Sequence, residues 1–273
     1  MTHSPPETEY GSGSLGHLVP TERDRLGTVE RLLDPFTVEG LAAIRLEPDA
    51  RCLELGGGAG SIAYHLAGRV PRGEVVVTDI DTRFLEPERR PNGFDNLRIV
   101  VHDLRHDPCP GPPFDLVHCR AVLDHLPERE RIVRSLPSWV RPGGHALLEC
   151  LDSSAAVASP HPPLHRMLDA ISTLMAKQTG GDFAFGRRLA SLVHASGFVV
   201  EDVTFHPLVV GDGGPGEVML MASIAQIESA LVGSGALRPD DVARFAEWVR
   251  EPGACDVYGH LCSVRARRPD DLR

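Results

Sequence analysis

The stretch Leu53-Glu54-Leu55-Gly56-Gly57-Gly58-Ala59-Gly60 decides the fold of this chain. An apolar run that is typical of a buried strand leads into a glycine-rich segment, and a helical pattern at 60–70 follows. Glycine is needed where the backbone takes a positive φ or where a ligand must lie against the main chain. The stretch therefore predicts a strand, a ligand-binding glycine loop and a helix; a loop that serves only as a tight turn is the alternative.

Two details indicate which ligand this loop binds. Residues 58–63 fit the fingerprint G-x-G-x-x-G/A of dinucleotide-binding proteins, so an NAD-dependent oxidoreductase is one reading. However, Glu54 lies two residues before Gly56, and a carboxylate there suits the ammonium group of an amino acid but not a pyrophosphate. The strand also places Gly56 at the turn, and in that frame Ser61 stands at the third glycine position. Both details disfavour the dinucleotide.

Acidic residues end the next two predicted strands. Asp79 follows Gly60 by nineteen residues, a distance at which a carboxylate can bind both hydroxyls of a ribose held on the glycine loop. A helix N-cap is the alternative role, and it falls more naturally on Asp81 or Thr82. After the following strand, Asp103 and Leu104 are expected to meet the amino edge and the face of an adenine, although an Asp at a strand end is often a turn residue.

Strands and helices alternate on both sides of the loop, which is typical of a doubly wound parallel sheet. The strands expected in the first half are Arg51–Leu55, Glu74–Thr78, Leu97–Val101, Asp115–Cys119 and His145–Cys150, with helical patterns at 60–70, 82–90 and 128–140. The second half predicts helices at 161–178, 186–196, 217–232 and 239–250 and strands at Phe198–Phe205 and Asp256–Arg265. We expect residues 47–273 to form one domain with helical cap insertions around 152–196 and 207–254.

Residues 1–46 are expected to form an N-terminal arm and lid helices. Residues 1–20 are rich in Ser, Gly and Pro and carry Tyr10, a mix expected of a mobile arm that closes over the site. A helical pattern follows at 21–46, with Thr21 as the expected N-cap and a break at Pro35.

Taken together, these motifs resemble the class I S-adenosylmethionine-dependent methyltransferases. The resemblance covers roughly residues 47–151, and its leader and the phrase at 78–85 look like a subgroup common in actinobacteria, some of whose members act in natural-product pathways. It is carried by the glycine loop, the acids described above and two further motifs, Phe114–Leu123 with His125-Leu126-Pro127 and Arg141-Pro142-Gly143-Gly144. The resemblance implies a Rossmann-like, seven-stranded, mostly parallel sheet and S-adenosyl-L-methionine as the cofactor.

The resemblance also implies a set of cofactor-binding residues. Glu54 would reach the ammonium group of the cofactor, and Asp79 its ribose. The expected cofactor site consists of Glu54, Gly56, Gly58, Gly60, Asp79, Ile80, Asp103, Leu104, Cys119 and Arg120, the last two beside the sulfonium. The Pro142-Gly143 pair fits a type II turn and is expected to be structural.

Transfer to a hydroxyl acceptor needs a base near neutral pH, which makes histidine the first candidate. We expect His125 to be that base, in preference to His118, which lies inside a strand and is expected to be buried as packing. Asp124 is expected to cap or orient its neighbour, and no metal site is expected, because Asp152 lacks partner carboxylates nearby. The predicted function is methylation of a small molecule in secondary metabolism; a cyclisation or rearrangement on the same fold is the alternative.

Composition excludes several partners. The formal net charge is −10, and no basic stripe suits a nucleic acid. No apolar run is long enough to span a membrane, and the six cysteines lack C-x-x-C spacing, so a cytoplasmic protein with reduced thiols is expected. A homodimer is left open.

Overall fold

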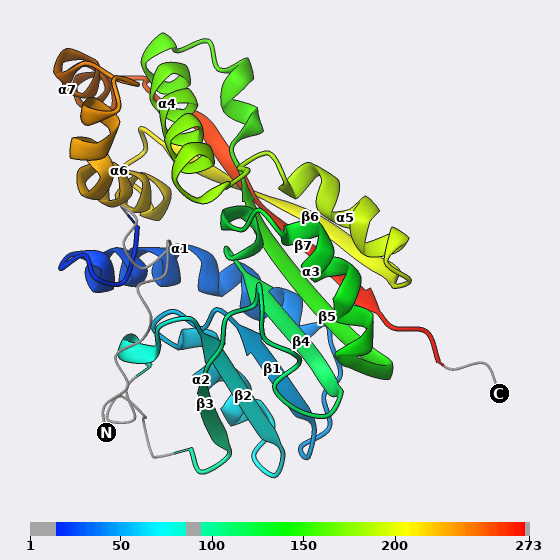
Figure 1. The fold of residues 1–273 in the computed structure, drawn as a ribbon. Helices are drawn as coiled ribbons and strands as arrows, with labels where there is room; N and C mark the ends of the chain where they lie inside the picture. Colours follow the sequence, from blue (N-terminus) through cyan, green and yellow to red (C-terminus); the bar gives the residue numbers. More distant parts are fainter. Residues whose placement is uncertain (1–14, 86–93, 271–273) are drawn as a thin grey trace.

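A seven-stranded sheet forms the centre of the molecule in the computed structural model, which describes residues 15–85 and 94–270 (Figure 1). Its strand order is β3-β2-β1-β4-β5-β7-β6. The strands are β1 (Arg51–Leu55), β2 (Glu74–Asp79), β3 (Leu97–Val101), β4 (Phe114–Arg120), β5 (Val140–Asp152), β6 (Val199–Val210) and β7 (Asp256–Arg267). The expected fold class, a doubly wound sheet of seven mostly parallel strands, is confirmed.

The glycine-loop strand β1 lies near the middle of the sheet. It pairs in parallel with β2 on one side and β4 on the other, whereas β7 is antiparallel to both β5 and β6. The side chains of Val75, Val76 and Val77 are fully buried, as expected of a parallel strand covered on both faces. Because β1, β2 and β4 run the same way, their carboxyl ends meet at one edge of the sheet, where a ligand binds in this kind of fold.

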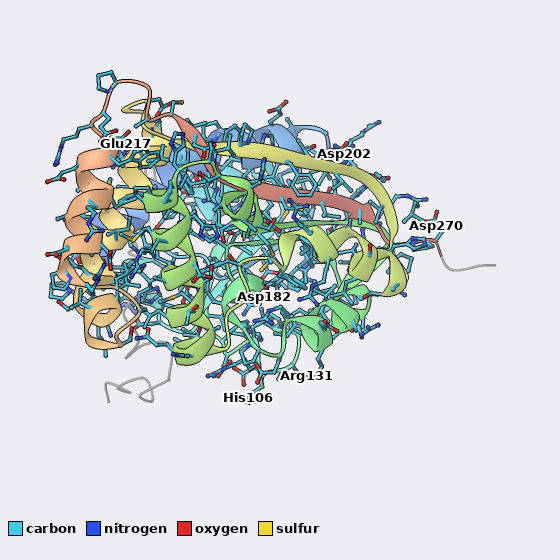
Figure 2. All side chains as sticks on the ribbon, turned by 90° about the horizontal axis from the view of Figure 1, so that it is seen from above. His106, Arg131, Asp182, Asp202, Glu217 and Asp270 are labelled. Atoms are coloured by element: carbon cyan, nitrogen blue, oxygen red, sulfur yellow. The ribbon has the colours of Figure 1, made fainter. Side chains whose placement is uncertain are left out.

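Helices cover both faces of the sheet. α2 (Ser61–Arg69) and the end of α1 (Glu22–Ala42) share one apolar cluster with the strands, and α3 (Arg129–Ser135) and α5 (Gly186–Ala195) share another. The remaining helices are α4 (Pro162–Thr179), α6 (Pro215–Gly233) and α7 (Pro239–Trp248), which pack with the start of α1 into a third cluster. In Figure 1 this third group lies beyond the carboxyl ends of the strands. The labelled charged side chains in Figure 2, among them Asp202 and Asp270, lie around the outside of the molecule.

The structure corrects several local expectations. Pro35 does not break α1, which continues from Glu22 to Ala42. The proline is exposed, so the carbonyl that loses its helical partner faces solvent, and buried leucines before and after it hold both halves of the helix in place. Thr21 stands at the N-cap position without capping the helix, because its hydroxyl donates instead to Gln226 Oε1 at 2.8 Å.

Two further segments differ from expectation. The predicted helix at 82–90 is a 3-10 turn at Thr82–Phe84, and the residues from 86 onward lie outside the described ranges. β5 begins earlier than predicted, at Val140, and includes the Pro142-Gly143 pair. Gly143 has a φ of 74°, and the pairing of β4 with β5 shifts register at this point, so the backbone turns locally within the strand. None of the helices in the described ranges has the length and apolar character needed to cross a membrane.

Candidate functional site

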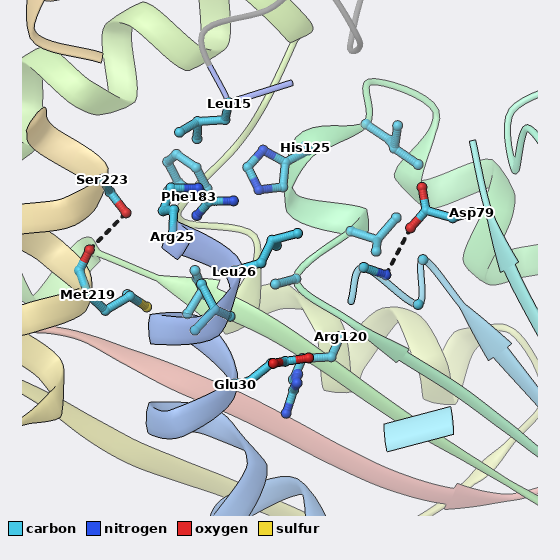
Figure 3. Close-up of a pocket in the computed structure, with 18 of the residues that line it drawn as sticks. Leu15, Arg25, Leu26, Glu30, Asp79, Arg120, His125, Phe183, Met219 and Ser223 are labelled. Carbon is cyan, nitrogen blue, oxygen red and sulfur yellow. Dashed lines mark hydrogen bonds between the residues drawn. The ribbon is translucent and has the colours of Figure 1, made fainter. Parts of the chain in front are cut away.

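A cavity opens at the carboxyl ends of β1, β2 and β4 and extends beneath α1, α4 and α6 (Figure 3). One half is lined by the glycine loop and by the acids that follow β2 and β3. The other half is lined mainly by apolar side chains of the helices, of β5, β6 and β7, and of the loop between α4 and α5, namely Leu26, Val29, Leu151, Leu168, Ile171, Phe183, Leu208, Met219, Leu220, Ile227 and Tyr258. The cavity therefore joins the predicted cofactor site to the helical cap.

The glycine loop takes the backbone conformation that its composition predicts. Gly56, Gly58 and Gly60 have φ values of 72°, 55° and 95°. A Cβ on Gly56 would lie 2.2 Å from Val122 Cγ2, so this glycine is required by packing against the segment after β4. A Cβ on Gly58 would meet only Leu26 Cδ2, at 3.8 Å, so Gly58 presents open backbone to the cavity.

Two predicted cofactor residues do not line the cavity. Gly60 caps α2, and a Cβ there would lie 2.8 Å from the Tyr64 ring, so it is needed for packing. Cys119 is fully buried in the apolar cluster with α3 and α5, and burial raises the pKa of its thiol well above the usual value. Alternate residues of a strand point to opposite faces of the sheet, and Arg120 lines the cavity, so the thiol of Cys119 points away from the cavity.

Asp79 lies at the mouth of the glycine loop. Its Oδ2 accepts a hydrogen bond from the Gly58 amide at 2.9 Å, and its Oδ1 accepts from the Asp81 amide at 3.1 Å. Burial raises the pKa of this carboxyl, and His17 Nδ1, 3.9 Å from Oδ1, acts in the opposite direction. The structure therefore brings Asp79 against Gly58, and Ile80 beside it also lines the cavity.

Asp103 has a partner that the sequence did not suggest. Both of its carboxylate oxygens accept from the Arg105 side chain, at 3.0 and 2.9 Å, and Oδ1 also accepts from the Arg105 amide. Burial opposes ionisation, but the contacts with Arg105 outweigh it and lower the pKa of Asp103. Asp103, Leu104 and Arg105 all line the cavity, so an adenine at this edge would meet an ion pair and not a lone carboxylate.

Glu54 is held by a histidine beneath the loop. Its Oε2 lies 2.6 Å from His118 Nδ1, and His118 Nε2 lies 3.1 Å from Glu149 Oε2. All three side chains are buried, and Glu54 also lines the cavity. The expectation that His118 is ordinary packing is therefore wrong, because an apolar environment would not place a carboxylate at each ring nitrogen.

Arg120 links the cavity to α1. Its guanidinium donates to Thr37 Oγ1 at 2.9 Å and to Asp34 Oδ1 at 2.8 Å, and Asp34 also accepts from the hydroxyl of Ser61. Arg120 lines the cavity near Glu30 (Figure 3). Arg120 therefore lines the cavity as predicted, but its guanidinium also holds α1 against the sheet.

His125 faces the cavity between its two halves, packed edge-on against Phe183 at 5.3 Å between ring centroids (Figure 3). Burial, with smaller contributions from Arg25 and Arg129, lowers its pKa to about 4, so the ring is neutral at pH 7. Its neighbour Asp124 is fully buried and accepts from the Leu151 amide at 3.3 Å. Burial raises the pKa of Asp124 to about 7.

Several cavity residues were not singled out from the sequence. Leu15 and His17 precede α1, and Arg25, Leu26, Val29 and Glu30 line the cavity from the helix itself. The sequence places Leu26 and Val29 at helical spacing, but this spacing does not predict whether that face of the helix packs on a core or on a ligand. Among the described residues, no group of three or more His, Cys, Asp or Glu side chains is arranged to hold a metal ion.

The comparisons with known proteins agree with this architecture. Residues 27–203 match the family model described as a methyltransferase domain. The chain is 28% identical over 244 residues to "Methyltransferase str3" of Strobilurus tenacellus, covering 83% of each protein. It is 27% identical to the ubiquinone/menaquinone biosynthesis C-methyltransferase UbiE of Vibrio parahaemolyticus, covering 66% of each.

Solved structures share the fold at low identity. The 4+2 cyclase SpnF aligns with a TM-score of 0.58 and 17% identity, over 88% of this chain and 82% of that one. The mycolic acid cyclopropane synthase CmaA1, solved with SAH, aligns with a TM-score of 0.59 and 12% identity, over 88% and 85%. The family match sets the dinucleotide reading aside and confirms S-adenosyl-L-methionine as the cofactor. The chain therefore belongs to the methyltransferase-domain family, as a class I S-adenosylmethionine-dependent methyltransferase.

Proposed function

We propose that this enzyme methylates a hydroxyl group of a small, uncharged and largely apolar acceptor, in a pathway of secondary metabolism. The observation that carries the proposal is the continuity of the cavity. It runs from the glycine loop, past His125, into the apolar space under α1, α4 and α6. A chamber with this lining favours an acceptor whose body is apolar, because burying apolar surface is the main favourable term in such binding.

The charged side chains that face the apolar half already have partners. Arg25 donates twice to the Glu22 carboxylate, at 2.8 and 2.7 Å. Asp152 accepts from the Ser154 and Arg187 amides, both at 3.0 Å. A charged amine or phosphate on the acceptor would have to displace these contacts or remain unpaired, which is costly in a buried site. The chamber therefore favours an uncharged acceptor.

The cofactor is proposed to lie along the glycine loop. Gly56 and Gly58 would face its methionine moiety, Glu54 its ammonium group, Asp79 its ribose, and Asp103 with Leu104 its adenine. The residues fit, because Gly58 offers open backbone, and the carboxylates of Glu54 and Asp79 line the same half of the cavity. When bound, the cofactor supplies an electrophilic methyl group on a sulfonium.

The acceptor oxygen would receive this methyl group, and the cofactor would leave as S-adenosylhomocysteine. The protein aligns the acceptor in a dry cleft, which is its main contribution. The acceptor proton is proposed to pass to a ring nitrogen of His125. A histidine with a pKa of about 4 is a weak base. It is nevertheless adequate here, because the hydroxyl proton becomes strongly acidic as the O–C bond forms.

The test is an acceptor panel incubated with S-adenosyl-L-methionine. Hydrophobic phenols and alcohols, matched with amine and phosphate analogues of the same carbon skeleton, are compared by mass spectrometry for the methylated product and for S-adenosylhomocysteine. We expect turnover with at least one uncharged hydroxyl compound and none with the charged analogues. Turnover confined to amines or phosphates would refute the assignment of the acceptor class.

A non-methylating cyclisation is the second candidate. It is supported by the likeness to the cyclase SpnF, which concerns the fold alone. A product of unchanged mass, formed without release of S-adenosylhomocysteine, would favour this alternative over methyl transfer.

A further inference from the structure

Glu54, His118 and Glu149 form a buried ionisable row across three neighbouring strands. Glu54 on β1 and His118 on β4 are direct cross-strand partners, and Glu149 lies on β5. The exposed fraction is 3% for Glu54 and zero for the other two residues. Burying charges costs several kcal/mol per ion unless they are paired, so a buried row of this kind needs a physical account.

Hydrogen-bond chemistry fixes the protonation of this row. A carboxylate oxygen only accepts hydrogen bonds, and each ring nitrogen of His118 lies within 3.1 Å of one. When both carboxyl groups are ionised, both ring nitrogens must carry a proton to make both contacts. Burial alone would lower the pKa of His118, but the two carboxylates outweigh it and raise the pKa to about 9. The ring is an imidazolium at neutral pH.

The row has two ends with different surroundings. At one end, Glu54 lines the cofactor half of the cavity. At the other end, Glu149 accepts from Thr37 Oγ1 of α1 at 2.6 Å and from Ser263 Oγ of β7 at 2.8 Å. Arg120 lowers the pKa of Glu149, and it forms an ion pair with Asp34 on α1. The row thus connects the cofactor half to the helix that roofs the apolar half.

We propose that His118 is a positioning residue that holds the Glu54 carboxylate for the cofactor ammonium group and, through Glu149 and Thr37, couples an occupied cofactor site to the placement of α1. This rests on the proposed contact of Glu54 with the ammonium. Occupancy of the cofactor half then orders Leu26 and Val29 over the acceptor half, so cofactor binding prepares the acceptor chamber.

The first test compares binding of S-adenosylhomocysteine to wild type and His118→Gln by calorimetry at pH 7.5 and pH 10. We expect wild type to bind about tenfold or more tightly at pH 7.5, where the imidazolium makes both charge-assisted bonds. The ratio should fall to about two or less at pH 10, where the wild-type ring loses its proton. The ligand's own ammonium also loses its proton by pH 10, which would remove the contact with Glu54, so the pH at which the ratio falls is compared with the nitrogen-15 titration of the His118 ring. A fall that does not follow that titration would overturn the proposal. A ratio near one at pH 7.5, or one unchanged at pH 10, would overturn the proposal.

The second test addresses α1 with a matched pair of isosteric variants. Thr37→Val removes the bond to Glu149 and the bond that Thr37 accepts from Arg120, whereas Thr28→Val removes a hydroxyl that bonds within α1, to the Arg25 carbonyl at 2.6 Å. Amide hydrogen exchange is measured with and without S-adenosylhomocysteine. Protection of α1 on binding should be lost in Thr37→Val and kept in Thr28→Val. Equal protection in both variants would show that the row does not reach α1.

Two controls keep the proposal falsifiable. If His118→Gln does not fold, nitrogen-15 NMR of the wild-type imidazole reads the charge of His118 directly, and a ring neutral at pH 7.5 would overturn the proposal. Glu54→Gln tests the premise separately. Unchanged affinity in Glu54→Gln would remove the ammonium contact and this proposal with it, while methyl transfer measured on the acceptor panel would still stand.

Discussion

The sharpest test of the glycine loop is a matched pair of single methyl additions, Gly58→Ala and Gly56→Ala. Both glycines have a left-handed φ, 55° and 72°, so each alanine costs the fold about 1–2 kcal/mol from the backbone alone. For a chain of this size that cost corresponds to a melting shift of about 2–8 °C. The neighbours of the new Cβ make the difference, because Gly56 faces Val122 at 2.2 Å and Gly58 faces the cavity.

We expect Gly58→Ala to fold and to lose affinity for S-adenosylhomocysteine. A methyl group forced into a filled site costs about 1–3 kcal/mol, which corresponds to a loss of about 5- to 150-fold in binding. Gly56→Ala should instead lose an additional ~1–3 kcal/mol of folding stability from the overlap with Val122. Calorimetric titration and thermal melts of both variants measure the two effects. If Gly58→Ala binds within twofold of wild type, the ligand does not lie against this glycine and the loop is only a turn.

Five further outcomes are expected. Asp79→Ala should weaken S-adenosylhomocysteine binding by about 1.5–3 kcal/mol with the fold intact, measured by calorimetry, and unchanged affinity would remove Asp79 from the site. Cys119→Ala should bind within threefold of wild type, because the thiol faces the apolar cluster; a larger loss would contradict that orientation. His125→Gln should lower kcat by about 10²-fold, the low end for a general base, without changing cofactor affinity. In an Asp124→Asn background, which removes the neighbouring carboxyl whose pKa is about 7, kcat should stay level from pH 8 to pH 5, because a pKa of about 4 keeps His125 neutral there; a limb near pH 6.5 would argue against the buried ring. Limited proteolysis of residues 1–20 should be slower with S-adenosylhomocysteine, since Leu15 and His17 line the cavity; equal rates would argue against a lid.

The central half of the fold could be predicted because its signals are local. β1 and β3 have the predicted bounds, β2 extends one residue further at its end, and β4 extends one residue further at both ends. Each is a short, mainly apolar run, and such a strand can be placed from its apolar pattern and from the residues that bound it. Pro35 shows the limit of the same reasoning, because whether a proline ends a helix depends on the packing of both flanks.

The site was less accessible because its contacts depend on register. Glu54 and His118 are 64 residues apart in the chain, and only the pairing of β1 with β4 brings them opposite each other. The contact of Asp103 with Arg105 is local, but the spacing alone does not predict it, because an aspartate two residues before an arginine does not always form an ion pair with it. The side of the strand on which Cys119 lies follows from register as well. The roles of the site residues, the domain boundaries and a homodimer stay predictions.

The packing of α1 against α6 has a consequence for the order in which the molecule assembles. Thr21 and Glu22 bond to Gln226 across more than 200 residues of sequence, and α6 supplies Met219, Leu220 and Ile227 to the cavity. Closing so long a loop is entropically costly and must be repaid by contacts that exist only once both segments are present. On a ribosome, the strand core up to β5 would emerge with its glycine loop long before α6 is synthesised. The residues of the glycine loop and of β2 to β4 that line the cavity are thus synthesised before those that α6 supplies.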